Sequence, residues 1–443
     1  MIDVSFYCNY FISGLSPRGF YVFNVAVHII NALLLFRFTA GLNMFSKKDQ
    51  YIFALAAGFL FLIYPFHNES IAWLSGRLSS MACFFALFIL LLAGETGGSR
   101  GVFLSILCYL TGLLCYESII VLPAIVMVLN WQRYKAAKKN ILFGLYWICA
   151  VCGYLLARFF LSGGITGDYG SRVTQEPLQQ KIIQSLKVLG RLFFPPSDNQ
   201  SLLTALVIIL FILLIAIHLY VFYHKMAVSF KSNYYRSLLI CLAISLSIPF
   251  AFGVSTHTSE GDRLLYFPSC FLCIIVAGWI IILYKSSLSR FLVLAVIGIY
   301  SVWLLEKNNQ YWVKASVAAK SIMEAVKKRG LYTVVFINMP DELEGAFIFR
   351  NGFMKALAVN HIDTNVVKVF SYLQRPDYLK VAGNIVPATK NDTLNIFPAT
   401  GIYTVEGRFI HLTNRLNNET WVLEKERNLI YYWNKENLVK VYQ

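Results

Sequence analysis

A dense polar cluster, residues 64–77, lies between two apolar runs of the sequence and contains His67, Glu69 and Arg77. A carboxylate such as Glu69 can act as a general base that takes the proton from an acceptor hydroxyl. An arginine such as Arg77 can bind a phosphate through two parallel hydrogen bonds. A divalent metal shared by His67 and Glu69 is a weaker alternative, because two ligands at one turn do not define a site. The cluster therefore combines a base with a phosphate ligand and leaves the metal requirement open.

A second ionisable cluster, residues 260–266, contains Arg263 and Tyr266. Arg263 is, like Arg77, a candidate phosphate ligand. For both arginines the equally weighted alternative is that the side chain snorkels to lipid headgroups. Weaker acidic candidates are Asp3, Glu260 and Asp262.

Two further polar features lie within or between apolar runs. Glu117 separates two short runs, and an ionisable group at that depth is costly and usually functional when it is tolerated. A pair with a neighbouring helix is the equally weighted alternative. Asn24, His28 and Asn31 are spaced by four and three residues, so they share one helical face. Bonding to neighbouring helices is the default interpretation of that face, ahead of ligand binding.

The composition indicates which elements must hold these side chains. The 443 residues are 57% hydrophobic and only 14% charged, whereas ordinary soluble domains are roughly 25% charged. This excludes a soluble globular enzyme, a disordered protein and a disulfide scaffold, and it indicates a polytopic membrane protein. The net charge of +16 is attributed to basic cytoplasmic loops rather than to nucleic-acid binding. The nine cysteines lie in or beside apolar runs, where packing is the favoured interpretation.

About ten apolar runs approach the roughly 20 residues that cross about 30 Å of hydrocarbon as a helix. They are Phe20–Leu42, Tyr51–Pro65, Leu78–Gly94, Val102–Cys115, Ser118–Trp131, Ile141–Leu161, Leu202–His224, Ser237–Val254, Leu264–Tyr284 and Phe291–Leu305. After Glu306 charged residues become frequent and apolar stretches shorten to strand length. The sequence therefore predicts a mainly α transmembrane bundle over residues 1–305 and a small soluble α+β domain over residues 306–443.

Local patterns predict the elements of that second domain. Helices are expected at Tyr311–Arg329 and Gly345–Val359, and a buried strand at Val334–Asn338. Further strands are predicted at Val366–Phe370, Thr393–Phe397, Phe409–Thr413, Trp421–Glu424 and Leu429–Trp433.

Basic residues set the expected orientation of the bundle. The turns that carry Lys47, Arg133, Lys225 and Lys285 are expected in the cytoplasm. The outer side then holds the N-terminal segment, the turns 66–77 and 255–263, the loop 162–201 and the C-terminal domain. This arrangement makes 102–131 two short spans, with Glu117 at the floor of a recess open to the outer side. Within the outer loop, apolar spacing over residues 176–194 predicts a helix that lies in the membrane interface or packs on the bundle.

Four stretches resemble, in the same order, motifs of the transmembrane and TPR-containing O-mannosyltransferases and their bacterial relatives, which belong to the GT-C superfamily of membrane glycosyltransferases. Tyr64–Arg77 looks like the His-Pro-x-His-x-Glu…Gly-Arg signature, and Glu260–Ser269 is similar to the Glu-Arg-x-Leu-Tyr-x-Pro-Ser turn. Gly14–His28 resembles the entry into the family's second span, and Tyr116-Glu117 with Pro123 resembles its Lys-Glu…Pro helix pair. The resemblance covers roughly residues 5–310 and implies a GT-C-like fold.

The resemblance implies transfer of a sugar, typically mannose, from a polyprenyl-phosphate carrier to a protein or glycan acceptor on the extracytoplasmic face. Catalytic roles fall to Glu69 and Glu117. Substrate-binding roles fall to Arg77, Arg263, His67, His28 and Tyr266. The expected partners are the lipid-linked donor, the acceptor and the bilayer, with no nucleic acid, and a divalent metal is the one cofactor considered.

The sequence also departs from the family pattern. Leu78-Ser79-Ser80 stands where an Asp is usual, Tyr116 replaces a Lys, and no TPR array follows. The superfamily's first outer loop, with its catalytic acidic pair, would lie upstream of Met1, so a preceding span is expected. An inactive scaffold or lipid-carrier binder is therefore an alternative, and a membrane transporter is another, although no internal repeat is visible. Short loops and a compact outer domain favour a bacterial inner membrane.

Overall fold

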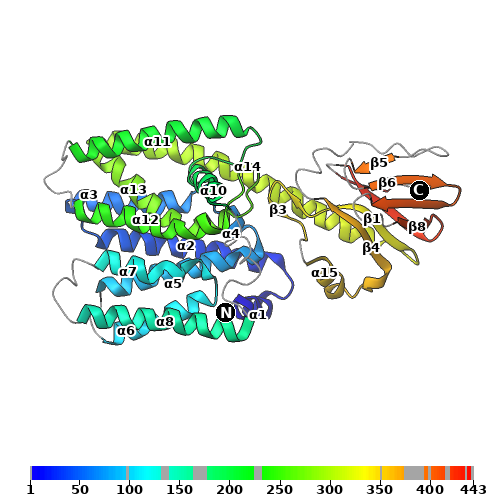
Figure 1. Ribbon diagram of the computed structural model, residues 1–443, viewed down its shortest axis with the longest axis horizontal. Coiled ribbons are helices and arrows are strands. Elements are labelled where there is room, and N and C mark those ends of the chain that lie inside the picture. The colour runs from blue at the N-terminus through cyan, green and yellow to red at the C-terminus, as the bar shows by residue number, and fades with distance from the viewer. Residues whose placement is uncertain are drawn as a thin grey trace. The chain divides into compact units, whose positions relative to one another are not determined.

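The computed structural model describes residues 2–95, 99–130, 139–162, 177–223, 232–349, 352–373, 394–397, 401–414, 420–434 and 437–440. The chain divides into two compact units, Met1–Asn308 and Asn309–Gln443. The first is helical and the second contains the strands (Figure 1).

The helices of the first unit follow the predicted apolar runs. The longer ones are α1 (Ile2–Ser13), α2 (Pro17–Gly41), α3 (Lys47–Leu62), α5 (Arg77–Glu95), α6 (Ser99–Leu113), α7 (Leu122–Asn130), α8 (Lys139–Ser162), α10 (Leu178–Arg191), α11 (Gln200–Tyr223), α12 (Ser232–Phe252), α13 (Tyr266–Leu283) and α14 (Ser287–Lys327). Short helical turns separate some of them, namely α4 (Asn68–Ile71), η1 (Leu74–Gly76), η2 (Glu117–Val121) and η4 (Asp262–Leu265).

Within the described residues, seven helices are long and apolar enough to cross a membrane. They contain α2, α5, α8, α11, α12, α13 and α14. The other three predicted runs form α3, α6 and the pair η2–α7, which are shorter. The prediction of a mainly α, polytopic membrane bundle is confirmed, and the protein is a membrane protein.

Helix α13 is the central element of the bundle. It packs against α3, α5 and α12, and 89% of its apolar segment is buried. Helices that are hydrophobic on every side belong in such positions, and Phe271, Ile274 and Ala277 are fully enclosed. The two turns that flank this helix, before Tyr266 and after Leu283, therefore lie at opposite ends of the bundle.

Two of the turns predicted to be cytoplasmic meet at one end. The Ser46 side chain caps α3 by accepting a hydrogen bond from the Asp49 amide. The Asp49 carboxylate pairs with Arg290 near the start of α14, at 2.6 Å. The basic turns at 131–138 and 224–231 lie outside the described residues.

The second unit is built around the buried strand β1 (Thr333–Pro340). It pairs in parallel with β4 (Val367–Leu373) on one edge and β9 (Asn428–Trp433) on the other, and β10 (Leu438–Lys440) runs antiparallel beside β9. A separate antiparallel sheet contains β5 (Leu394–Phe397), β6 (Gly401–Glu406), β7 (Phe409–Asn414) and β8 (Thr420–Glu424).

Both faces of β1 are covered. Val334 and Phe336 pack with Ile322 and Val326 of α14 and with the helix α15 (Phe353–Val359). Val335 and Ile337 on the other face pack with Ile410, Leu412 and Leu423 of the antiparallel sheet. Alternate residues of a strand point to opposite faces, so one apolar strand joins a helical layer to a second sheet.

Two predictions for the C-terminal part need correction. The predicted helix Gly345–Val359 is helical only at Phe353–Val359, and its beginning belongs to the short hairpin of β2 (Glu342–Leu343) and β3 (Ala346–Phe347). Gly345 has φ of +87° in the hairpin turn, a conformation available to glycine and foreign to a right-handed helix. The predicted helix Tyr311–Arg329 is also not separate, since α14 continues through the charged residues after Leu305.

Candidate functional site at one end of the bundle

The turns 64–76 and 253–265, which carry two of the quoted motifs, meet through the Glu69–Arg263 pair. Glu69 lies on α4, and its fully buried carboxylate accepts a hydrogen bond from the Arg263 amide at 2.8 Å and another from the Arg263 guanidinium. Burial raises the pKa of Glu69 above its ordinary value, while the charge and hydrogen bonds of Arg263 oppose that rise. The pair therefore joins two segments that are far apart in the sequence.

Gly76 is needed to fold the first of these turns. A Cβ atom at this position would lie 1.9 Å from the Glu69 carbonyl oxygen, so only glycine permits the close approach. On the second turn, Gly261 has φ of +91° and lies immediately before η4, whose first two residues are Asp262 and Arg263. Gly76 and Gly261 therefore shape the two turns that hold the ionic side chains.

Arg263 is the accessible member of the pair. Its side chain is 17% exposed, whereas that of Glu69 is fully enclosed. The guanidinium also lies over the Trp73 ring, 5.5 Å from its centroid, and interacts with Tyr116. A cation that is held by a carboxylate and an aromatic ring, yet reaches solvent, can bind a phosphate without leaving its place.

A second ionic pair lies directly beside the first. Arg191, at the end of α10, donates two hydrogen bonds to Asp262 at 2.6 and 2.7 Å, and both side chains are buried. The same guanidinium donates to the Ser255 carbonyl at 3.0 Å and stacks over Phe66 at 4.8 Å. Arg191 is not among the site residues predicted from sequence. Its signal was a basic residue at the end of an amphipathic helix, directly before Leu192 and Phe193.

The predicted substrate-binding residues His28, His67 and Tyr266 come together, but inside the bundle. His28 Nδ1 and the Tyr266 hydroxyl are 2.7 Å apart, and His67 Nε2 lies 2.8 Å from the Ser269 hydroxyl. All of these side chains are buried. Burial, with a further contribution from the neighbouring His28, holds the pKa of His67 well below its ordinary value. This network positions the turn above it and presents no open surface.

Asn24 and Asn31 support the default interpretation of their helical face. Asn24 donates to the Ile71 carbonyl at 3.0 Å, and Asn31 donates to the Ser80 carbonyl at 2.8 Å. His28 lies between them and contacts the Leu62 carbonyl at 3.1 Å. The face therefore bonds α2 to its neighbours.

Arg77 is not brought to the Arg263 site. Its guanidinium is buried and donates to the Asn9 side chain of α1 at 2.6 Å, with Phe6 and Phe23 stacked against it. Arg77 thus fastens α1 to the start of α5.

Glu117 provides an exposed carboxylate at this end of the bundle. It begins η2, pairs with Arg158 and accepts a hydrogen bond from the Tyr154 hydroxyl at 3.0 Å, and its side chain is 49% exposed. Both partners belong to α8. The Tyr116 side chain interacts with Arg263. Glu117 therefore directly follows a residue that contacts the Glu69–Arg263 pair.

The residues described contain no group of three or more histidine, cysteine, aspartate or glutamate side chains that could hold a metal ion. His67 and Glu69 point to different partners, Ser269 and Arg263, rather than toward a common point. The arrangement offers an accessible guanidinium and an accessible carboxylate, which suit an anionic donor and a hydroxyl acceptor.

The fold and site therefore define a polytopic membrane protein with an ionic site at one end of its bundle. Part of the chain is similar to protein O-mannosyl-transferases. The chain is 33% identical over 123 residues to protein O-mannosyl-transferase Tmtc1 of Drosophila melanogaster. The matched region is 26% of this chain and 13% of the relative. The TMTC1 proteins of Mus musculus and Homo sapiens are 32% and 30% identical over 87 residues, 20% of this chain and 9% of each relative.

The chain thus spans about a tenth of the length of these relatives. No protein-family model matches it, and no solved structure matches it. The partial similarity supports a relationship to O-mannosyltransferases and a glycosyltransferase-like function.

Proposed function

We propose that this protein is an integral-membrane glycosyltransferase of GT-C type. It transfers a sugar, with mannose as the first candidate, from a polyprenyl-phosphate carrier to a protein or glycan acceptor on the extracytoplasmic face. The observation that carries the proposal is the Glu69–Arg263 pair, which joins the two turns with the family-like motifs. The predicted orientation makes this end of the bundle extracytoplasmic, in a bacterial inner membrane, together with the C-terminal domain.

Each side chain has a separate role in the proposed reaction. Arg263 binds the phosphate of the donor and stabilises its charge as the polyprenyl phosphate departs. Glu69, enclosed behind Arg263, is a positioning residue. Glu117 is an accessible carboxylate and takes the proton of the acceptor hydroxyl. The acceptor oxygen forms the new bond to the anomeric carbon, and the leaving phosphate oxygen keeps the electron pair of the broken bond.

A second function is favoured by the engagement of the acidic side chains. Both carboxylate oxygens of Glu69 accept hydrogen bonds from Arg263, and Glu117 is paired with Arg158. A protein with this site could bind the lipid carrier without turnover. Measurements of donor binding and of transfer separate the two functions.

The test uses the purified chain in lipid nanodiscs with radiolabelled polyprenyl-phosphate-mannose and an acceptor peptide or glycan. Glu117→Gln should lower the rate of sugar transfer by about 10²- to 10⁴-fold, the usual contribution of a general base. It should leave donor binding unchanged. Arg263→Gln should weaken donor binding, and Arg263→Lys should restore it only in part because lysine lacks the planar fork.

Glu69→Gln should act through Arg263, so its defect should be in donor KM more than in kcat. Arg408→Gln, on an exposed residue of the second unit, is the matched control for loss of a positive charge. Donor binding without transfer by the full gene product would establish the carrier-binding function instead. Absence of both binding and transfer would overturn the proposal.

A further inference from the structure

The two carboxylates of the candidate site differ in how many of their oxygens are engaged. Glu69 uses both, since Oε2 accepts from the Arg263 amide and Oε1 from the Arg263 guanidinium. Glu117 uses one, because the contacts that the described residues make with its carboxylate, from the Tyr154 hydroxyl and from Arg158, both fall on Oε1. Within that part of the chain, Oε2 of Glu117 is left for a ligand, on a side chain that is 49% exposed.

Both contacts to Glu117 come from one face of α8. Tyr154 and Arg158 are four residues apart on this helix, so their side chains are neighbours on its surface. Arg158 is the one charged residue between Asn140 and Ser162. A charged side chain in an apolar span is costly and usually functional, and only 11% of this span is buried. An otherwise apolar helix thus directs two polar side chains to a single carboxylate oxygen.

Aromatic packing fixes the level of α8 beside Glu117. Trp147 of α8 is buried and lies edge-on to Tyr109 of α6, with 5.3 Å between the ring centroids. The Tyr109 hydroxyl donates to the Ile120 carbonyl at 2.9 Å. Ile120 belongs to η2, the turn that begins at Glu117. Tyr109 therefore links α8 to the turn that carries the proposed base.

The residue before Glu117 connects it to the proposed phosphate ligand. Tyr116 interacts with Arg263, and consecutive Cα atoms are about 3.8 Å apart. The Tyr116-Glu117 dipeptide therefore limits the separation between the phosphate ligand and the base. Two donors on Oε1 also fix the plane of the carboxylate, so that Oε2 points in one direction.

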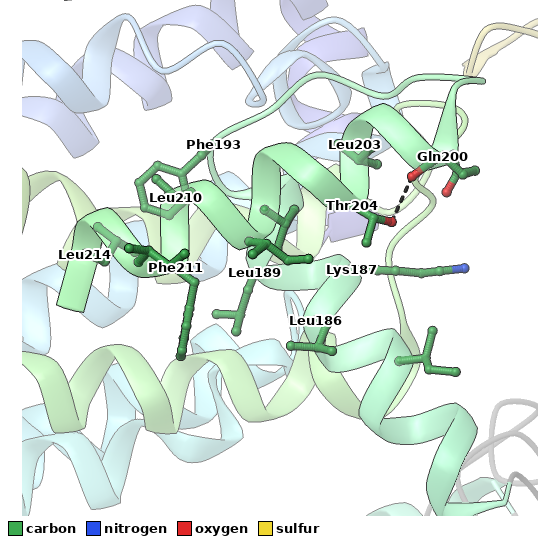
Figure 2. Close-up of a pocket in the computed structure, with 14 residues that line it drawn as sticks. Leu186, Lys187, Leu189, Phe193, Gln200, Leu203, Thr204, Leu210, Phe211 and Leu214 are labelled. Atoms are coloured by element: carbon green, nitrogen blue, oxygen red, sulfur yellow. Dashed lines mark hydrogen bonds between the residues drawn. The ribbon is translucent and has the colours of Figure 1, made fainter. Parts of the chain in front are cut away.

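The pocket between α10 and α11 offers no competing base. Figure 2 shows its lining, in which Lys187 is the one charged side chain among the fourteen described residues. None of the fourteen is a carboxylate or a histidine, the groups that most often act as general bases. The pocket therefore does not replace Glu117 as the source of the base.

We infer that Oε2 of Glu117 takes the proton of the acceptor hydroxyl, and that Tyr154 and Arg158 are positioning residues that act through Oε1. The inference rests on the proposed function and adds to it the reacting atom and the helix that orients it. In this step the acceptor O–H bond breaks and its proton goes to Oε2. The electron pair of the acceptor oxygen forms the bond to the anomeric carbon, and the phosphate oxygen leaves with the electrons of the broken bond.

The test is a double-mutant cycle on sugar transfer by the purified full chain in nanodiscs. Tyr154→Phe removes one hydrogen bond and no charge, and it should lower kcat about ten- to hundredfold without changing the donor KM. In the Glu117→Gln background the same substitution should have no further effect, because residues that act as a unit are not additive. Arg158→Gln should behave in the same way. Tyr146→Phe, at a 47% exposed position of α8, is the matched control and should transfer normally.

Chemical rescue examines the same contacts without the Glu117 side chain. Glu117→Ala leaves space for formate to bind Tyr154 and Arg158 in place of the carboxylate. Formate should raise transfer by this variant about tenfold or more, whereas chloride at equal ionic strength should not. Adding Tyr154→Phe should raise the formate concentration needed for half-maximal rescue about tenfold, the effect of losing one hydrogen bond to a charged group.

Equal falls in kcat in the parent and Glu117→Gln backgrounds would overturn the inference and leave Tyr154 and Arg158 with a structural role. So would formate rescue that is insensitive to Tyr154→Phe. The inference and the proposed function fail in different ways. Transfer with additive effects removes the positioning roles only, whereas a parent chain that transfers no sugar removes the proposed function and these roles with it.

Discussion

Asp262 and Arg263 are consecutive residues with separate ionic partners, since Asp262 pairs with Arg191 and Arg263 pairs with Glu69. Each pair therefore contributes separately to the stability of the site. Asp262→Asn should destabilise the bundle by about 3–5 kcal/mol, because it leaves the buried Arg191 guanidinium without its counter-charge. Denaturant unfolding of the purified protein measures the change.

Arg408→Gln, which breaks an exposed pair with Glu424 at 3.8 Å, should cost about 1 kcal/mol or less in the same assay. Equal effects of the two variants would contradict the assigned burial of the Asp262–Arg191 pair.

His67 should make the stability of the protein sensitive to acid. Its pKa is held below the unfolded value of roughly 6.5, so below that pH the unfolded chain takes up a proton that the folded chain excludes. This contribution to stability is present above roughly pH 6.5 and is lost at about 1.4 kcal/mol per pH unit as the pH falls. Thermal unfolding between pH 7 and 5 should therefore be less pH-dependent in His67→Gln. His257→Gln, at an exposed site, should keep the dependence of the parent protein, and an unchanged slope in His67→Gln would contradict the prediction.

The types of residue at the site were predictable from sequence, whereas their partners were not. The sequence predicts Glu69, Glu117 and Arg263 as candidates because charged groups are scarce in an apolar chain. Nothing local showed that Arg77 would turn to α1, or that Arg191 would reach Asp262. Such pairings depend on how helices distant in sequence pack together.

At the level of elements, hydrophobic length was the reliable signal. Over the residues that the structure describes, each of the ten predicted apolar runs is mostly helical, since backbone groups within lipid must bond internally. Polarity was a poor signal for the end of a helix, because α14 continues through Glu306 and Lys307. The β2–β3 hairpin was missed because its strands are two residues long, too short to show alternation.

The link between β1 and β9 provides a test at this level. The Asn338 amide donates to the Trp433 carbonyl at 3.1 Å and accepts from the Trp433 amide at 2.7 Å. Asn338→Ala leaves both buried backbone groups unpaired and should destabilise the second unit by about 1–3 kcal/mol. Hydrogen exchange of β9 in the full chain measures the effect. Asn360→Ala, whose side-chain bond is exposed, should change exchange by less than about 0.5 kcal/mol, and equal changes would count against the bridge.

For the whole molecule, the proposed chemistry depends on which end of the bundle faces the cytoplasm. We expect single cysteines at His257 and Glu426 to react with an impermeant maleimide in intact cells. A cysteine at Ser286, beside the Asp49–Arg290 pair, should react only after permeabilisation. The parent chain measures the background from its nine native cysteines. Labelling of Ser286→Cys in intact cells would reverse the orientation and separate the site from an extracytoplasmic donor.

The central position of β1 has a consequence for biosynthesis. Val334 pairs with Val367 on one edge of the strand and with Leu429 on the other. The ribosome must therefore translate through β9 before the central strand acquires both neighbours, long after the apolar helices have left the exit tunnel. A stop codon between β4 and β9 would leave an apolar strand with one open edge, a template for intermolecular pairing. We expect nascent chains that end in this interval to be prone to intermolecular pairing.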